Sequence, residues 1–200
     1  MPPVKHLRVP AGKEDVEALR PGDFVVLDGE LVITAGIPTY ARLAQCLKDG
    51  TPPPIDMNGA ALLHFGGMSG IDGDKFSLRY INPTTSTRFN GAMPGLIRGF
   101  GLRIVGGKGG LDANCVAAMR DSGCVYLSFI GGGCTLFSES IREVIDIGWK
   151  DMIPHYRLLK LRVEGLGPAV VGIDAHGNSL YADSERAAQI NLKTALADNA

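Results

Sequence analysis

Residues 101–133 read "GLRIVGGKGGLDANCVAAMRDSGCVYLSFIGGG", and this stretch decides the expected fold. Its two apolar runs, "LRIV" and "CVYLSFI", are typical of buried strands. Between them, apolar residues recur at helical spacing, namely Leu111, Cys115, Ala118 and Met119. Gly123 stands where a helix over these residues would end. Two strands joined through a helix run parallel with a right-handed crossover. The stretch therefore predicts an α/β fold with a parallel strand–loop–helix core and further, mixed sheets around it.

The rest of the chain carries weaker patterns of strands, helices and turns. Before the core they predict a short helix in the polar lead-in 1–22, a hairpin over 23–36 that turns at Asp28-Gly29, a helix over 38–50, a strand over 60–67, a polar loop over 68–75 and a strand over 76–81. After the core they predict a helix from Thr135 to Val144, strands over 156–181 and a helical tail that frays. We expect one domain over residues 1–200, with about 181–200 as its C-terminal tail.

Composition excludes several classes of protein. The chain has 200 residues, a net charge of -1 and 45% hydrophobic residues, so one well-packed domain is expected and no partnership with nucleic acid or an anionic membrane. No apolar run reaches the roughly 18 to 20 residues of a membrane span, and the first residues lack the apolar stretch of a signal peptide. We therefore expect a cytoplasmic protein.

The cysteines do not follow a metal-binding spacing. The four cysteines are Cys46, Cys115, Cys124 and Cys134, and none forms a CxxC pair. We therefore expect free thiols and no zinc or iron–sulfur site held by this chain alone. Cys134 follows three glycines and could be a reactive thiol at a helix start, but no His or Asn in the sequence marks it as a nucleophile.

Several apolar strands end in glycine or polar residues. These ends are Gly66-Gly67, Asn82–Thr85, Gly106–Gly110 and Gly131–Gly133. In parallel α/β sheets the ligand crevice lies outside the carboxyl ends of the strands, and glycine lets the backbone approach a ligand there. The glycines could equally serve tight turns. Because several such loops occur together, and two carry a basic residue, we favour a single anion site.

The run "INPTTSTRFNGAMPG", residues 81–95, places four hydroxyl side chains before Arg88. One hydroxyl is enough to cap a helix, so the run exceeds that need. Arg88 suits a carboxylate, and Lys108, flanked by glycines, could supply the second cation that a dicarboxylate requires. His64, at the end of an apolar strand, is a candidate for a supporting role behind the site, whereas His6, His155 and His176 lie in polar stretches and are expected at the surface.

The same segments resemble one enzyme family. The chain is similar over about residues 5–180 to the β subunit, or C-terminal domain, of class I fumarases and L-tartrate dehydratases. The resemblance is carried by "GDFVVLDGELVITAGIPTYARL", "NGAALLHFGG", "PTTSTRFNGAMPGLI", "RIVGGKGG" and "VYLSFIGGGC", of which the Pro-Thr-Thr-x-x-Arg and Gly-Lys-Gly segments are the most specific. It implies a swivelling β/β/α domain in a hydro-lyase that reversibly removes water from a 2-hydroxy dicarboxylic acid of the malate or tartrate type.

The resemblance also implies partners and residue roles. An α subunit would hold a 4Fe-4S cluster, and the two subunits would form a hetero-oligomer, with a dimer of αβ as one arrangement. Thr84 matches the proton-abstracting hydroxyl, and Arg88 and Lys108 match carboxylate-binding positions. Substrate would also contact Thr85, Ser86, Gly107, Gly109, Gly131 and Gly132, and no metal ligand is expected in this chain.

Two segments depart from the family pattern. "TAGIPTYARL", residues 34–43, has Gly36 and Ile37 near the place of an arginine–acid pair, and Arg42 matches a different position. "KDMIPHYRLLK", residues 150–160, replaces an acidic segment that contains Pro-Glu. We therefore expect one carboxylate contact to be missing. An alternative function follows, in which the chain is a stand-alone anion-binding or interaction module without catalysis.

Overall fold

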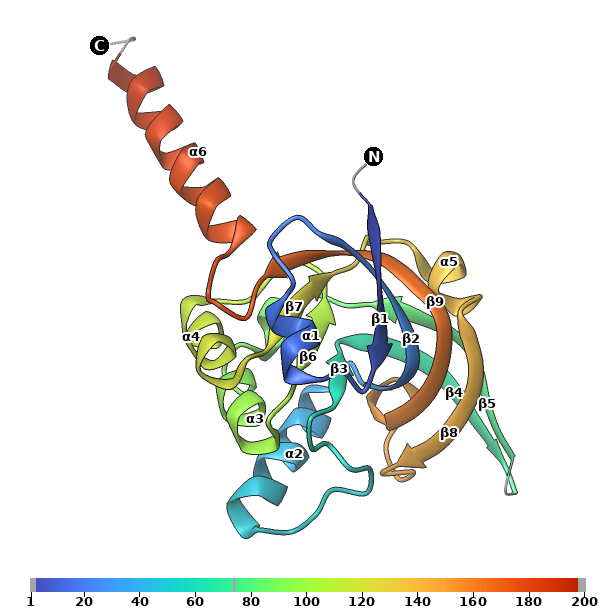
Figure 1. The fold of residues 1–200 in the computed structure, drawn as a ribbon. Coiled ribbons are helices and arrows are strands. Elements are labelled where there is room, and N and C mark those ends of the chain that lie inside the picture. The colour runs from blue at the N-terminus through green and yellow to red at the C-terminus, as the bar shows by residue number, and fades with distance from the viewer. Residues whose placement is uncertain (1–2, 74, 198–200) are drawn as a thin grey trace.

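The computed structural model describes residues 3–73 and 75–197 and shows a mixed α/β fold (Figure 1). The strands are β1 (Val4–Val9), β2 (Phe24–Ile33), β3 (Ala61–Leu63), β4 (Phe65–Asp72), β5 (Lys75–Pro83), β6 (Ile104–Gly107), β7 (Val125–Ser128), β8 (Ile141–Gly148) and β9 (Leu158–Ile173). The helices are α1 (Lys13–Glu17), α2 (Ile37–Asp49), α3 (Met93–Phe100), α4 (Ala113–Ser122), α5 (Cys134–Ser138) and α6 (Leu180–Ala197), with 3₁₀ turns η1 (Ser86–Phe89) and η2 (Pro154–Tyr156).

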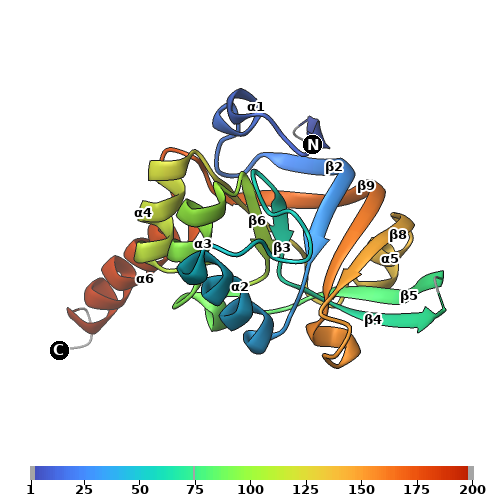
Figure 2. The same cartoon turned by 90° about the horizontal axis from the view of Figure 1, so that it is seen from below.

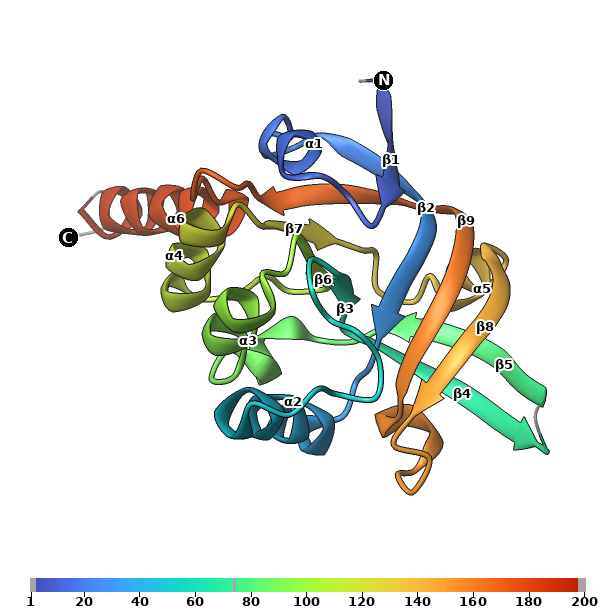
Figure 3. The ribbon, with the colours of Figure 1, turned by 60° about the horizontal axis from the view of Figure 1, so that its bottom comes forward.

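Seven strands form one sheet in the order β1-β2-β3-β6-β7-β9-β8. The pairings from β1 through β2, β3 and β6 to β7 are parallel, whereas β9 runs antiparallel to β7, β8 and β2. Because β9 pairs with β2 as well as β7, the sheet closes into a ring. The remaining two strands, β4 and β5, form an antiparallel hairpin that extends from the body (Figure 3).

Alternating side chains of the central strands supply two hydrophobic clusters. In β3, Leu62 belongs to the cluster between the sheet and helices α2, α3 and α4, which lie together on one face (Figures 2 and 3). Ala61 and Leu63 belong to the other cluster, which the opposite sides of β2, β7 and β9 share. Since strand side chains alternate with a period of two, one short strand anchors both cores.

The core predicted from residues 101–133 is confirmed. Strands β6 and β7 pair in parallel, and α4 lies between them in the chain. Asp112 caps α4 by accepting a hydrogen bond from the Cys115 N–H at 3.0 Å, and Gly123 ends the helix with a left-handed φ of 66°. The helix predicted over 38–50 is also present as α2, and Gly50 ends it in the same way.

The short helix predicted in the lead-in 1–22 is confirmed as α1, but two other N-terminal expectations are wrong. Residues 23–36 do not form a hairpin, because β2 continues through Asp28-Gly29, and residues 4–9 of the predicted lead-in form β1 beside it. Gly29 has a φ of 122°, and a Cβ there would lie 2.1 Å from the Val9 carbonyl oxygen. The glycine thus serves a close approach between paired strands instead of a turn.

Four further predictions need correction. Gly66-Gly67 does not end a strand but lies inside β4, and the predicted loop 68–75 belongs largely to the β4–β5 hairpin. The helix predicted from Thr135 to Val144 ends at Ser138 and is followed by β8, because residues 141–148 pair with β9. The strands predicted over 156–181 are one long strand, β9, and the start of α6.

Helix α6 projects from the body (Figure 1). None of its residues is buried, and only Tyr181 at its base is partly covered. The helix predicted for the tail is therefore confirmed, while the last positions expected to fray, 198–200, lie outside the described residues. Among the described residues, no helix is both long and apolar enough to cross a membrane.

Candidate active site

Backbone hydrogen bonds bring the ends of three strands together. The Thr84 N–H donates to the His64 carbonyl at 2.7 Å, just after β3. The Lys108 N–H donates to the Thr84 carbonyl at 3.1 Å, and the Ser86 N–H donates to the Lys108 carbonyl at 2.8 Å. Residues 84–86 therefore run parallel to the end of β6, with Thr85 opposite Lys108. Thr84 and Lys108, which are distant in sequence, are held side by side by their main chains.

Gly107 permits this close approach. A Cβ at that position would lie 2.3 Å from the Ser86 Oγ, 3.0 Å from the His64 Cβ and 3.1 Å from the Thr84 carbonyl oxygen. Any side chain would push the Thr84 segment away from β6. Gly107 is buried, so its packing role is plain, whereas its contact with substrate stays a prediction.

The Lys108 side chain crosses to the glycine loop that follows β7. Its Nζ lies 3.8 Å, and its Cδ 3.5 Å, from the place where a Cβ of Gly131 would be. Gly131 and Gly132 are exposed, as is Gly109, whose φ of 82° favours glycine. Within the described residues, Lys108 has no ion-pair partner, so its charge is available to an anion.

A cavity of about 300 Å³ opens at Thr84, and we call it the Thr84 cavity. Arg88, on η1, lines the cavity and has no ion-pair partner among the described residues. No Asp or Glu is among its lining residues, which are Ala35, Ile37, Gly66, Tyr80, Asn82, Pro83, Thr84, Arg88, His155 and Tyr156. The cavity is therefore suited to an anion rather than a cation.

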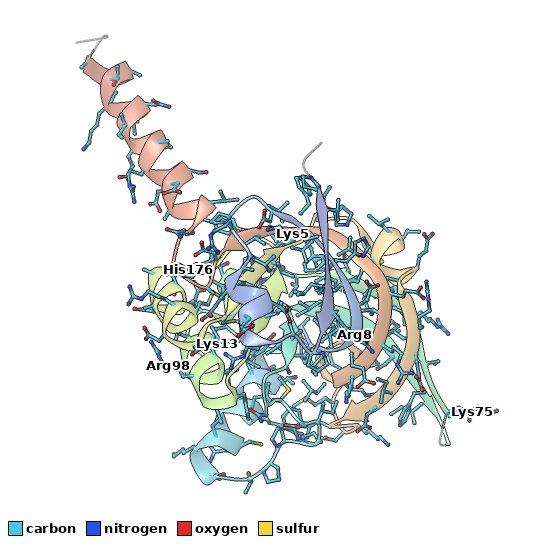
Figure 4. The ribbon with its side chains drawn as sticks, in the orientation of Figure 1. Lys5, Arg8, Lys13, Lys75, Arg98 and His176 are labelled. Atoms are coloured by element: carbon cyan, nitrogen blue, oxygen red, sulfur yellow. The ribbon has the colours of Figure 1, made fainter. Side chains whose placement is uncertain are left out.

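A larger cavity of about 450 Å³ lies between β1, β2, β8 and β9 and includes Arg8 (Figure 4). Its lining includes the carboxylates of Asp28 and Glu164, and two of its arginines are already ion-paired, Arg142 to Glu164 at 2.9 Å and Arg162 to Glu30 at 3.1 Å. The Thr84 cavity is thus the better candidate site, although it is the smaller of the two.

The four hydroxyl side chains of residues 84–87 have different environments. Thr84 lines the cavity, and Thr85 is half-buried beside Gly109. Ser86 is fully buried and its Oγ lies 2.8 Å from the Tyr126 hydroxyl, so it is engaged inside the protein. Thr87 is exposed. The roles of Thr85 and Ser86 in substrate binding stay predictions, and Thr84 is the one of these four residues that lines the cavity.

His64 lies behind the Thr84 segment. Its imidazole is fully buried near the rings of Tyr40 and Phe89, and neither ring nitrogen has a hydrogen-bond partner among the described residues. Desolvation lowers its pKa to about 3, so the ring is neutral. Its backbone binds both Thr84 and Gly106, with the His64 N–H donating to the Gly106 carbonyl at 2.6 Å. The supporting role predicted for the side chain is not tested by this geometry.

The cysteines are free thiols, as predicted. Burial raises the pKa of the Cys115 thiol to about 12 and raises that of Cys124 further above its ordinary range. Among the described residues, no three His, Cys, Asp or Glu side chains are placed to hold a metal ion. The described residues therefore do not fit a 4Fe-4S cluster held by this chain.

Sequence reasoning missed several residues of the Thr84 cavity. Tyr80 comes from β5, and His155 and Tyr156 come from η2. His155 is exposed, as expected, but it also lines the cavity. The signal was present in the two departures from the family pattern, because "TAGIPTYARL" contributes Ile37 and "KDMIPHYRLLK" contributes His155 to the same cavity.

Comparison with known proteins supports the family suggested by these residues. The family model for the fumarase C-terminus matches residues 4–184. The L(+)-tartrate dehydratase subunit beta of Escherichia coli K12 is 30% identical over 182 residues, which cover 91% of this chain and 89% of that protein. A Geobacillus stearothermophilus protein provisionally named a class I fumarate hydratase is 31% identical over 181 residues, which cover 90% of this chain and 34% of the longer protein. The chain belongs to the fumarase C-terminus family.

Proposed function

We propose that this chain is the β subunit of a hydro-lyase that reversibly removes water from a 2-hydroxy dicarboxylic acid of the malate or tartrate type. One observation carries the proposal: Thr84 and Arg88 line the same cavity, which has no Asp or Glu in its lining, and the Thr84 carbonyl accepts a hydrogen bond from the Lys108 N–H. Among the described residues, neither Arg88 nor Lys108 has an ion-pair partner. The names of the relatives, tartrate dehydratase β subunit and class I fumarate hydratase, support the reaction class.

In the proposed reaction, Thr84 takes a proton from the carbon next to the one that bears the hydroxyl group. A threonine hydroxyl is a poor base in water, so nearby cations in a water-poor site must lower its pKa. Arg88 and Lys108 supply such cations and bind the carboxylates. The partner's 4Fe-4S cluster supplies Lewis-acid chemistry at the substrate hydroxyl when it is bound.

The proposal extends to assembly and location. An α subunit would hold the cluster, because the described residues of this chain offer no fitting donor set. The β chain would swivel to close its Thr84 cavity over substrate bound to that subunit, in an oligomer built from αβ pairs. Free thiols at all four cysteines favour a reducing compartment, the cytoplasm.

The test is co-expression with the α partner under anaerobic conditions, followed by assays of hydroxy diacid dehydration. We expect Thr84→Ala, Arg88→Ala and Lys108→Ala each to lower kcat/KM by about a hundredfold or more. Matched controls are Thr87→Ala, in the same hydroxyl run, and Lys75→Ala, at the hairpin tip (Figure 4). Wild-type turnover in the three site variants would refute the assigned roles.

The alternative, a stand-alone anion-binding module, makes a different prediction. It requires the isolated chain to bind a dicarboxylate tightly, which calorimetry measures directly. The β-subunit names of the relatives favour the catalytic assignment. Dicarboxylate binding that is seen only after the α partner is added would support the catalytic assignment as well.

A further inference from the structure

We propose that His155 and Tyr80 together bind a substrate carboxylate in the Thr84 cavity. This inference rests on the proposed function, because it concerns the same site and the same class of diacid. It assigns specificity to two residues that the sequence patterns did not single out.

The His155 ring has a defined orientation. Its Nδ1 lies 3.0 Å from the Gly67 carbonyl oxygen in β4, and a carbonyl can only accept, so Nδ1 carries a hydrogen. The Nε2 atom then lies 3.4 Å from the Tyr80 hydroxyl. Both side chains line the Thr84 cavity. An imidazole nitrogen and a phenol hydroxyl are therefore placed together at its wall.

The segment that carries His155 is anchored on two sides. The Arg157 guanidinium lies 3.5 Å from the Ser69 carbonyl in β4, and the Thr34 hydroxyl donates to the Tyr156 carbonyl at 3.3 Å. Gly36 gives Tyr156 room to pack, since a Cβ there would lie 2.7 Å from the Tyr156 Cβ. His155 is thus presented by a fixed turn rather than by a loose loop.

Charge in the cavity favours a second anionic group near this pair. Arg88 is the one permanently charged side chain among the lining residues, and His155 is the other lining group that can carry a positive charge. Ala35, Ile37 and Pro83 add apolar surface that suits the carbon chain of a diacid. The His155–Tyr80 pair would therefore bind one of the two carboxylates together with the Arg88 and Lys108 cations of the proposed function.

In an imidazolium both ring nitrogens donate, so Nδ1–H can keep the Gly67 carbonyl while Nε2–H donates to a carboxylate placed against the pair. The Tyr80 hydroxyl can turn to donate to the same carboxylate. Two charge-assisted hydrogen bonds result.

The test uses the assembled enzyme with its α partner and four variants. His155→Asn keeps a donor near the Gly67 carbonyl but has no group at the Nε2 position, whereas His155→Gln places an amide near that position. Tyr80→Phe removes the hydroxyl alone. His176→Asn is the matched control, because His176 is exposed beside the base of α6, far from the β4–β5 hairpin (Figure 4).

The readouts are KM and kcat for the hydroxy diacid, and inhibition constants for succinate and butyrate, which have two and one carboxylates on chains of equal length. We expect His155→Asn and Tyr80→Phe to raise KM and the succinate constant about tenfold or more, with kcat changed less than threefold. The butyrate constant should stay at the wild-type value. His155→Gln should recover part of the succinate affinity, and His176→Asn should match the wild type.

An unchanged succinate constant in both His155→Asn and Tyr80→Phe would overturn the inference while leaving the proposed function in place. An equal loss of succinate and butyrate affinity would also overturn it, because the pair would then not recognise the second carboxylate. A wild-type complex that dehydrates no hydroxy diacid would instead overturn the proposed function.

Discussion

Replacing His64 by leucine should reduce the loss in the free energy of unfolding that the protein shows as the pH falls below 7. Burial lowers the His64 pKa from 6.5 to about 3 in the folded chain. Between these values the unfolded chain binds a proton that the folded chain does not, so the free energy of unfolding falls as pH falls. The loss attributable to His64 is about 2 kcal/mol between pH 7 and pH 5, and about 3 kcal/mol between pH 7 and pH 4.

Urea unfolding of the wild type, His64→Leu and the control Met57→Leu at pH 7, 5 and 4 measures this loss. The relevant quantity is the difference in pH dependence between variants, because the carboxylates contribute equally to all three chains. Met57 is buried and carries no titratable group, so Met57→Leu should leave the wild-type pH dependence intact. If His64→Leu lost as much stability between pH 7 and pH 5 as the wild type, the imidazole would not be buried and neutral, and the reasoning would fail.

Two further perturbations have defined outcomes. Gly107→Ala should lower the free energy of unfolding by about 1–3 kcal/mol, because the new Cβ would crowd Ser86 and the Thr84 carbonyl. Gly91→Ala is the control, because a Cβ there would meet no described atom within 4 Å apart from its chain neighbours. Equal denaturation midpoints for the two variants would contradict the packing argument. Limited proteolysis should cut first within residues 182–197, whose side chains are all exposed, and mass spectrometry of the fragments locates the cut. A thermal melt of the remaining fragment should show a melting temperature lowered by less than about 2 °C. First cleavage elsewhere would show that α6 is protected.

Local signals account for the parts of the fold that the sequence predicted. Helix α4 could be located because Asp112 and Gly123 determine its two ends within one short segment. Strand β8 could not, because residues 141–148 become a strand through pairing with β9. The turn predicted at Gly29 is also wrong because of a contact between strands, since the residue that requires a glycine there is Val9 on the neighbouring strand β1.

The candidate site divides in the same way. Thr84 and Arg88 lie four positions apart, so one motif in the sequence points to both. Tyr80 and His155 meet only after the β4–β5 hairpin packs against η2, and no local pattern reports that contact. The sequence does mark both departures from the family, but only the three-dimensional structure shows that Ile37 and His155 belong to one cavity.

Strand β9 determines when the molecule can be completed during synthesis. Its antiparallel partner β2 ends at Ile33, whereas β9 begins at Leu158, so the ring has no closing strand until most of the chain has been made. At ribosomal speeds this delay is on the order of ten seconds, during which one edge of β2 lacks its neighbour. A nascent chain arrested before β9 therefore exposes unpaired strand edges to chaperones and proteases, and protein quality control can distinguish it from the finished subunit.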